Sequence, residues 1–380
     1  MWSLGSLREE REKRGWSHTR LASELRRAAN AKRINLPKTE SLARNFARWE
    51  NGAGGLSDMY RDLFCEVYGK TAVELGLVAP APAPAETEDA GAVELAAQLS
   101  RASAVDAGLV ELLQGQTNGI RRLDARQGAQ FIQDQTRAHL ANLTDMHQHV
   151  IVPGTRRLLS WVLADTSALA GWQALDVGAL NESWLHFERA KTAAREAEDP
   201  ALLAFASAEQ AYVLLDMGQP DQATALVEAT RDEAKTQVPP LMASWLAASE
   251  AEMRAATGDD RGARLALDEA DSLHPANPDV ELPYVVLNST HLGRWRGSTL
   301  ARLGDPEAIE NLSAALDETA GAYARAEAGL RVDLATALLV RGEPSAADEH
   351  LQAARVLALR IGSARQQRRI DGLSSAPENA

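Results

Sequence analysis

Cysteine and aromatic residues are scarce in this sequence, and their scarcity excludes some classes of protein. The 380 residues contain one cysteine, and aromatic side chains make up 5% of the chain. A single cysteine excludes an internal disulfide framework and is typical of a reducing compartment. No apolar run approaches the roughly 20 residues that a membrane helix needs, and the N-terminus MWSLGSLREEREKR lacks the apolar segment of a signal peptide. We therefore expect a soluble, cytoplasmic protein with no membrane partner.

Motifs for catalysis and metal binding are also missing. The sequence has no phosphate loop, GxSxG elbow, HExxH helix or paired-cysteine motif. The residues that come nearest to a metal cluster are His139, Asp145, His147 and His149. His147 and His149 are two positions apart, so they do not share a helix face, and we expect solvent-facing histidines there. We predict a protein that is not an enzyme and has no catalytic residues, no metal and no cofactor.

Positive charge is concentrated at the start of the chain. Residues 1–78 hold 14 Lys and Arg against 10 Asp and Glu, whereas the rest hold 26 against 43, within a total net charge of −13. A basic head on an acidic body indicates a polyanionic partner for the head alone. The acidic body would repel nucleic acid, which disfavours binding by the whole surface.

Residues 39–52 (TESLARNFARWENG) have the pattern of an amphipathic helix that ends at an Asn-Gly stop signal. Its apolar face contains Leu42, Phe46 and Trp49. The opposite face presents Ser41, Arg44 and Arg48, with Asn45 at the boundary. Arg is suited to guanine edges and Asn to adenine edges, so this helix suits a major groove. The alternative is an ordinary surface helix with solvated arginines.

Other short helical segments flank this one within residues 1–78. Gly15 is expected to end the first helix, Ser17 to cap the second and Ser57 to cap the fourth. A fifth is expected to begin at the capping box TAVE of residues 71–74. Cys65 lies inside the fourth segment, where a small buried thiol is expected.

Three stretches within residues 4–77 resemble the helix-turn-helix domain of the XRE (Cro/C1-type) regulators: LREEREKRGWSHTRLASEL, ARWENG and YRDLFCEVYGKTAVELG. The likeness is greatest to the actinobacterial branch, in which this domain precedes a tetratricopeptide-like region. The resemblance implies a lambda-repressor-like domain of five helices, whose second and third helices form the motif and whose third helix reads DNA.

Carried over residue by residue, the resemblance implies a set of DNA contacts. The best base or groove contacts are Arg44, Asn45 and Arg48, and the DNA-binding set also includes Lys38 and Ser41. The implied phosphate contacts are Ser17, His18 and Arg20. Trp49 is expected in the core, and Glu50 is expected to orient a neighbouring Arg.

The connection between the two motif helices departs from the tight turn of most relatives, because residues 30–37 (NAKRINLP) intervene. Some actinobacterial members share a longer connection, so we expect it to be tolerated. The start of the recognition helix is open between Lys38 and Ser41. Lys32 and Arg33 in the connection either reach phosphate or are solvated.

Residues 79–91 begin with APAPAPA and continue with acidic and small residues, which predicts a semi-rigid polyproline II linker. Residues 92–150 are expected to form one or two long connecting helices. Residues 151–372 are expected to form a repeat domain, and residues 373–380 a disordered tail.

The repeat is marked by glycines that close apolar helices at intervals of 38 to 46 residues: Gly178, Gly218, Gly258, Gly304 and Gly342. An alanine follows five positions after three of them, at Ala223, Ala263 and Ala347. A turn glycine followed by a small residue that lets paired helices approach is typical of tetratricopeptide-like repeats, although the spacing exceeds their ~34 residues. The sequence therefore predicts an all-α protein: a helix-turn-helix domain, an Ala-Pro linker and an α-solenoid.

The concave surface of such a solenoid is expected to hold a peptide or another protein. The candidate inner residues are Trp172, Tyr212, Trp245, Asn288, His291 and Trp295. A packing role is expected for Trp172. Asn288, His291 and Arg294, at three-residue spacing in one helix, are the candidate ligand-binding group.

These features together predict a transcription regulator that binds double-stranded DNA as a homodimer through its head. The body is expected to dimerise, to sense a peptide, small molecule or protein partner, or to do both. Two alternatives stay open. The body is a protein-interaction adaptor that uses DNA as an address, or it senses a peptide, as do the Gram-positive quorum receptors built from the same two modules.

Overall fold

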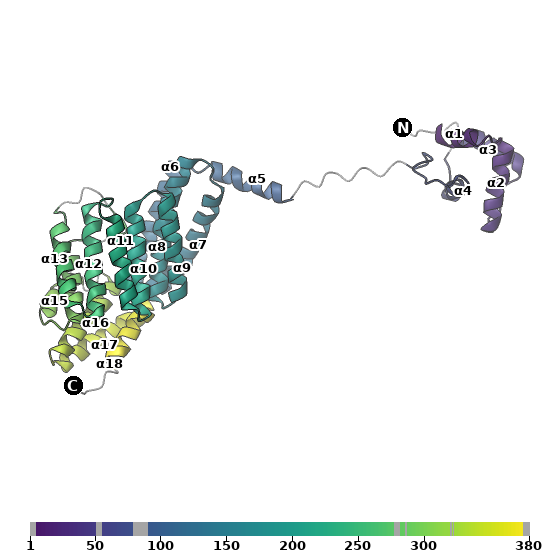
Figure 1. Ribbon diagram of the computed structural model, residues 1–380. Helices are drawn as coiled ribbons and strands as arrows, with labels where there is room; N and C mark the ends of the chain where they lie inside the picture. The colour runs from purple at the N-terminus through teal and green to yellow at the C-terminus, as the bar shows by residue number, and fades with distance from the viewer. Residues whose placement is uncertain are drawn as a thin grey trace. The chain divides into compact units, whose positions relative to one another are not determined.

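The chain forms two compact units, residues 1–90 and 91–380. The computed structural model describes residues 5–50, 55–78, 90–276, 282–285, 287–319, 321 and 323–374. All regular secondary structure in these ranges is helical (Figure 1), which confirms the all-α fold class. None of the helices in the described ranges is long and apolar enough to cross a membrane.

The helices of the N-terminal unit are α1 (Gly5–Lys13), α2 (His18–Ala31), α3 (Thr39–Glu50) and α4 (Asp58–Tyr68). Ser17 caps α2 as predicted, because its hydroxyl accepts a hydrogen bond from the Arg20 amide at 3.2 Å. Ser57 stands at the N-cap of α4 but makes no side-chain cap bond. The Asn-Gly stop signal predicted after α3 lies outside the described residues.

The segment expected as a fifth helix is a single turn, so this expectation was wrong. The capping box forms, since the Thr71 amide donates to the Glu74 carboxylate at 2.8 Å and the Glu74 amide donates to the Thr71 hydroxyl at 3.3 Å. Gly76 then adopts a left-handed φ of 65°, which ends the turn. Leu75 still packs into the core, with 1% of its surface exposed.

The core of the N-terminal unit is aliphatic and aromatic. Leu42 and Phe46 of α3 are fully buried against α2 and α4. Trp49 is half-buried, with its ring 4.6 Å from that of Tyr60, so it is structural as predicted. Cys65 is half-buried rather than fully buried, and burial raises the pKa of its thiol.

The connection between α2 and α3 is a packed structure. The Ile34 amide donates to the Ala29 carbonyl at 2.8 Å, and Arg33 adopts a left-handed φ of 56°. This is the capping geometry that usually takes glycine. Leu36 is buried with 7% of its surface exposed, so the longer connection is anchored to the core. Helix α3 starts at Thr39, within the interval from Lys38 to Ser41 in which its start was predicted.

The helices of the C-terminal unit are α5 (Ala90–Ser103), α6 (Ala107–Gln127), α7 (Ala129–His149), α8 (Pro153–Asp176), α9 (Leu180–Glu196), α10 (Pro200–Asp216), α11 (Pro220–Ala234), α12 (Pro240–Thr257), α13 (Asp260–Leu273), α14 (Ser289–Arg302), α15 (Ala308–Thr319), α16 (Ala324–Val340), α17 (Pro344–Ile361) and α18 (Ala364–Ser374). Figure 1 shows α8 to α13 standing side by side. Residues 92–150 contain most of α5 and all of α6 and α7, so they form three helices rather than one or two. The breaks fall where Asp106 caps the start of α6 and Gly128 ends it. Residues 79–89, where polyproline II was predicted, lie outside the described ranges.

The glycine and alanine signature of the repeat is confirmed. The five predicted glycines follow α8, α10, α12, α14 and α16 with φ between 74° and 84°. The alanines Ala223, Ala263 and Ala347 are fully buried at 0% exposure. Their small side chains let the second helix of each pair approach the first.

The end of the solenoid packs against its beginning. Helix α16 contacts α6, α17 contacts α7, and α18 contacts α8. A side chain at Gly128, before α7, would collide with Ile361 at the end of α17, so the approach requires glycine. Residues 373 and 374, expected in the tail, belong to α18, and the rest of the tail lies outside the described residues.

Candidate functional site

Helix α3 carries the polar stripe predicted to read DNA. Lys38 directly precedes the helix. Ser41, Asn45 and Arg48 follow on α3 at intervals of four and three residues and share one face, which adjacent Arg44 extends. The two arginines and Lys38 are exposed, and Ser41 and Asn45 are half-exposed. Because Leu42 and Phe46 fix the opposite face in the core, the stripe has a rigid support.

Glu50 locks α3 to the start of the unit. Its carboxylate accepts hydrogen bonds from Arg11 Nε at 2.7 Å and Nη2 at 3.0 Å, and its Oε2 lies 3.1 Å from His18 Nε2. Burial opposes ionisation of Glu50, but the bonds from Arg11 and His18 hold its pKa below the usual range. Glu50 therefore binds an Arg, as predicted, and fixes the start of α2 relative to the end of α3.

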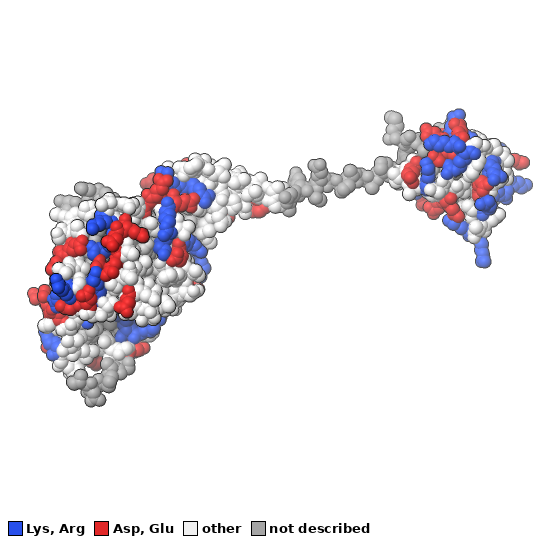
Figure 2. Space-filling model, viewed as in Figure 1, with Lys and Arg blue, Asp and Glu red and all other residues white. Residues whose placement is uncertain are grey.

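Many basic residues of this unit are already engaged in ion pairs. Figure 2 shows Lys and Arg side chains among Asp and Glu over the visible face of the unit. Arg20 pairs with Glu24 at 2.7 Å, and Lys32 pairs with Glu66 at 2.6 Å. Among the described residues, Lys38 and Arg44 form no ion pair, and the same holds for Arg26 and Arg33 outside the stripe. Their charge is therefore available to a polyanion.

The inner face of the C-terminal unit is acidic. Carboxylates project from the first helices of the pairs, and they are Asp124, Asp165, Asp176, Glu209, Asp216, Glu252 and Asp333. Arginines of α16 and α18 bind several of them: Arg325 contacts Asp124 at 2.6 Å, and Arg369 contacts Asp333. The Arg325–Asp124 pair joins α16 at the end of the solenoid to α6 at its beginning, whereas the Arg369–Asp333 pair joins α18 to α16 within the end.

Arg365 of α18 is the most enclosed of these arginines. Only 9% of its surface is exposed, and its Nε lies 3.0 Å from both carboxylate oxygens of Asp216. Its guanidinium also lies over the rings of Trp172 at 5.5 Å and Tyr212 at 5.6 Å. The inner face thus already binds one cation with two aromatic rings and a carboxylate.

A cavity of about 210 Å³ lies between α6, α8, α10, α16 and residues 282–285. Aromatic rings supply much of its wall, from Trp172, Phe205 and Tyr284. Glu209 lines it as well, and burial raises the pKa of that carboxyl to about 8. Trp172, expected to be a packing residue, therefore also faces this cavity and Arg365.

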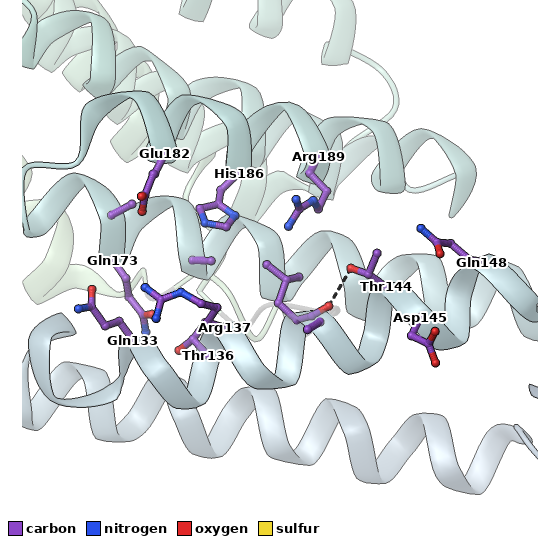
Figure 3. A pocket seen from close by; sticks show the side chains of 14 residues that line it. Gln133, Thr136, Arg137, Thr144, Asp145, Gln148, Gln173, Glu182, His186 and Arg189 are labelled. Atoms are coloured by element: carbon purple, nitrogen blue, oxygen red, sulfur yellow. Dashed lines mark hydrogen bonds between the residues drawn. The ribbon is translucent and has the colours of Figure 1, made fainter. Parts of the chain in front are cut away.

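A larger groove of about 560 Å³ runs between α7 and α9, with α8 as its floor (Figure 3). Arg137 and Arg189 face it from opposite sides, and Glu182 and Asp145 lie toward its ends. Both signs of charge meet there, so its chemistry favours no single class of ligand.

The predicted ligand group Asn288, His291 and Arg294 lines neither of these two cavities. Asn288 precedes α14 instead of lying within it, because its side chain caps the helix by accepting from the His291 amide at 2.9 Å. Burial and the neighbouring Arg294 lower the pKa of His291 to about 4. The ligand role of this group stays a prediction.

The expectation of solvent-facing histidines was wrong for two of them. His139 is buried against Thr117, 3.0 Å away, and His147 is buried between Ser160 at 2.8 Å and Glu196 at 2.9 Å. The pairing of α7 with α6 and α8 buries both rings, and burial lowers the pKa of each. In the described ranges, no group of three His, Cys, Asp or Glu residues could hold a metal ion.

Sequence reasoning missed the cation-binding inner face. The segment ARQQRR at residues 364–369 could have indicated this face, since it places three arginines close together in a region whose net charge is negative. The partners of those arginines are distant in the sequence: Arg365 and Asp216 are 149 residues apart. Only the packing of α18 onto α8 brings them together.

No family model matches the sequence, and no curated protein matches it. Among solved structures, the chain is similar to PlcR of Bacillus thuringiensis, crystallised in complex with a peptide and DNA. The identity is 11% and the TM-score 0.34, over 99% of this chain and 100% of that one. A likeness at this level carries no argument about function, and the resemblance to the Cro/C1-type regulators stays a prediction.

Proposed function

We propose that this chain is a DNA-binding transcription regulator that reads a duplex through α3. The observation that carries the proposal is the stripe of Lys38, Ser41, Arg44, Asn45 and Arg48 on a rigidly supported helix. An α-helix is about 10–12 Å across with its side chains, which fits a major groove about 12 Å wide. The positive charge on this face complements the phosphates that flank the groove.

The contacts divide into base readout and positioning. Arg44 and Arg48 have the donor geometry for guanine, and Asn45 that for adenine. Ser17, His18 and Arg20 at the start of α2 supply candidate phosphate contacts. Exposed Arg20 has to exchange its half-buried partner Glu24 for phosphate, and Arg27 stays beside Glu24 at 3.7 Å when it does.

We further propose that the protein acts as a homodimer. One head contacts few base pairs, so two heads on a symmetric site would double the contacts. Helix α5 supports this proposal, because Leu95 and Leu99 are one turn apart and expose 48% and 37% of their surface. A second copy of α5 would cover them.

The C-terminal unit is proposed to sense a ligand. Its inner face supports this role, since first helices that are far apart in the sequence converge there on one cavity. A peptide, a small molecule or a protein segment that binds there would bridge the helix pairs. Ligand binding would then change the packing of the solenoid.

The test is selection of bound duplexes from a random-sequence library by the full-length protein at moderate salt. We expect a recurrent sequence, arranged as two half-sites if the protein is a dimer. An unenriched pool from a folded protein would contradict the proposal. Binding that is strong in low salt but shows no sequence preference would contradict base readout by α3.

A further inference from the structure

The cavity of the inner face contains one carboxyl group that forms no direct ion pair with a described residue, although Arg365 is near enough to lower its pKa. Arg121 binds Asp165, and Arg325 binds Asp124, so both arginines of the wall are neutralised. Glu209 is different. Its Oε2 is buried and has no hydrogen-bond partner among the described residues.

The hydroxyl of Tyr284 is the second polar group without a partner in this cavity. Tyr284 is 7% exposed, and its hydroxyl has no hydrogen-bond partner in the described part of the structure. Its ring packs 4.8 Å from that of Phe205. A buried polar atom without a partner is costly in a folded protein. Two such atoms around one cavity indicate that a ligand completes it.

Arg365 shows which chemistry this face accepts. Its guanidinium lies over Trp172, which also lines the cavity, and binds Asp216. The cavity shares Trp172 with that site and adds Phe205, Tyr284 and Glu209, and no described residue pairs directly with the Glu209 carboxyl. Rings and a carboxylate together recognise organic cations through ion pairing and cation–π attraction.

We propose that the cavity binds a small organic cation, an amine or guanidine attached to an apolar group. The cationic head would pair with Glu209 and lie against the ring faces of Trp172 and Phe205. The apolar part of the ligand would fill the remaining volume of the cavity. About 210 Å³ exceeds the roughly 150 Å³ cavity that holds benzene, so a ring with a short aminoalkyl arm fits. The inference deepens the proposed sensing role and rests on it for any effect on DNA binding.

The test compares 2-phenylethylamine with 2-phenylethanol by isothermal titration calorimetry on the full-length protein. The two probes share a ring and a chain length and differ in the charged group. We expect the amine to bind with a Kd below about 1 mM and the alcohol to bind at least about tenfold more weakly. Equal binding of the two, or no binding of the amine, would overturn the proposal.

Variants identify the site. Glu209→Gln keeps the shape of the side chain and is expected to weaken amine binding about tenfold or more while leaving the alcohol unchanged. Glu182→Gln removes the same charge from the outer groove on α9 and is expected to change neither probe. Phe205→Leu is expected to weaken both probes, because it removes a ring of the wall. Amine binding that Glu209→Gln leaves intact would refute the site.

Proton release gives an independent readout. Burial raises the pKa of the Glu209 carboxyl to about 8, with Glu252 of α12 raising it and Arg365 of α18 lowering it. Amine binding at pH 7 should therefore ionise Glu209 and release a proton, which titrations in buffers of different ionisation enthalpy detect. DNA affinity is measured on the same samples. If the protein binds the amine but no DNA, the proposed role as a DNA-binding regulator is refuted and the amine site is not. If it binds DNA but binds amine and alcohol equally, the amine site is refuted and the regulator role is not.

Discussion

Replacing Arg44 by alanine separates DNA readout from folding. The Arg44 side chain is exposed, and its hydrogen bond from Nε to the Glu40 carbonyl is long at 3.5 Å. Its removal should change the free energy of unfolding by less than about 0.5 kcal/mol. A bidentate contact with guanine contributes about 1–3 kcal/mol, so affinity for a selected half-site should fall by about 5- to 150-fold.

The assay is fluorescence anisotropy with a selected duplex and a scrambled one, across a range of salt concentrations. Arg8→Ala is the matched control, because Arg8 is also exposed, on α1, and forms an ion pair with exposed Glu12. We expect Arg44→Ala to lose the preference for the selected duplex and Arg8→Ala to keep it. Equal loss in both variants would indicate general charge, and no loss in Arg44→Ala would show that α3 does not read this site.

Three further predictions concern buried charges. Glu50→Ala should destabilise the N-terminal unit by about 3–5 kcal/mol, because it strips Arg11 and His18 of a buried partner; an unchanged chemical denaturation curve would contradict this. The pKa of Glu209 is about 8 in the folded chain, so the stability of the protein relative to Glu209→Gln should decline by a few kcal/mol as pH rises from about 4.5 to 8. A pH-independent difference in denaturation midpoint would count against that burial. Arg365→Ala should leave Asp216 with only the exposed Arg368, 3.5 Å away, and destabilise the closed solenoid by about 3 kcal/mol, with faster amide exchange in α18; unaltered exchange would show that α18 docks without Arg365.

The repeat architecture was predictable because its signals are local. A glycine that must adopt positive φ after a helix, and an alanine that must fit between two helices, are each constrained by immediate neighbours. Gly218 and Ala223 satisfy both constraints as expected. The α3 stripe was predictable for the same reason, since helix periodicity alone separates Leu42 and Phe46 from Arg44.

Features that depend on distant segments were not predictable from pattern. His139 reads as a polar surface residue until the pairing of α6 and α7 buries it against Thr117. The cation-binding face depends on Arg365 reaching Asp216 across the closed solenoid, and no local rule relates those positions.

The most direct test of base readout by α3 is a double-mutant cycle that combines a change in the protein with a change in one DNA base. In a selected site, each guanine is replaced in turn by 7-deazaguanine, which lacks the N7 acceptor in the major groove. The account predicts that one replacement weakens binding of the full-length protein by about 1–3 kcal/mol and has no effect on the Arg44→Ala variant. Equal losses in both proteins at every guanine would contradict a contact between Arg44 and a base edge.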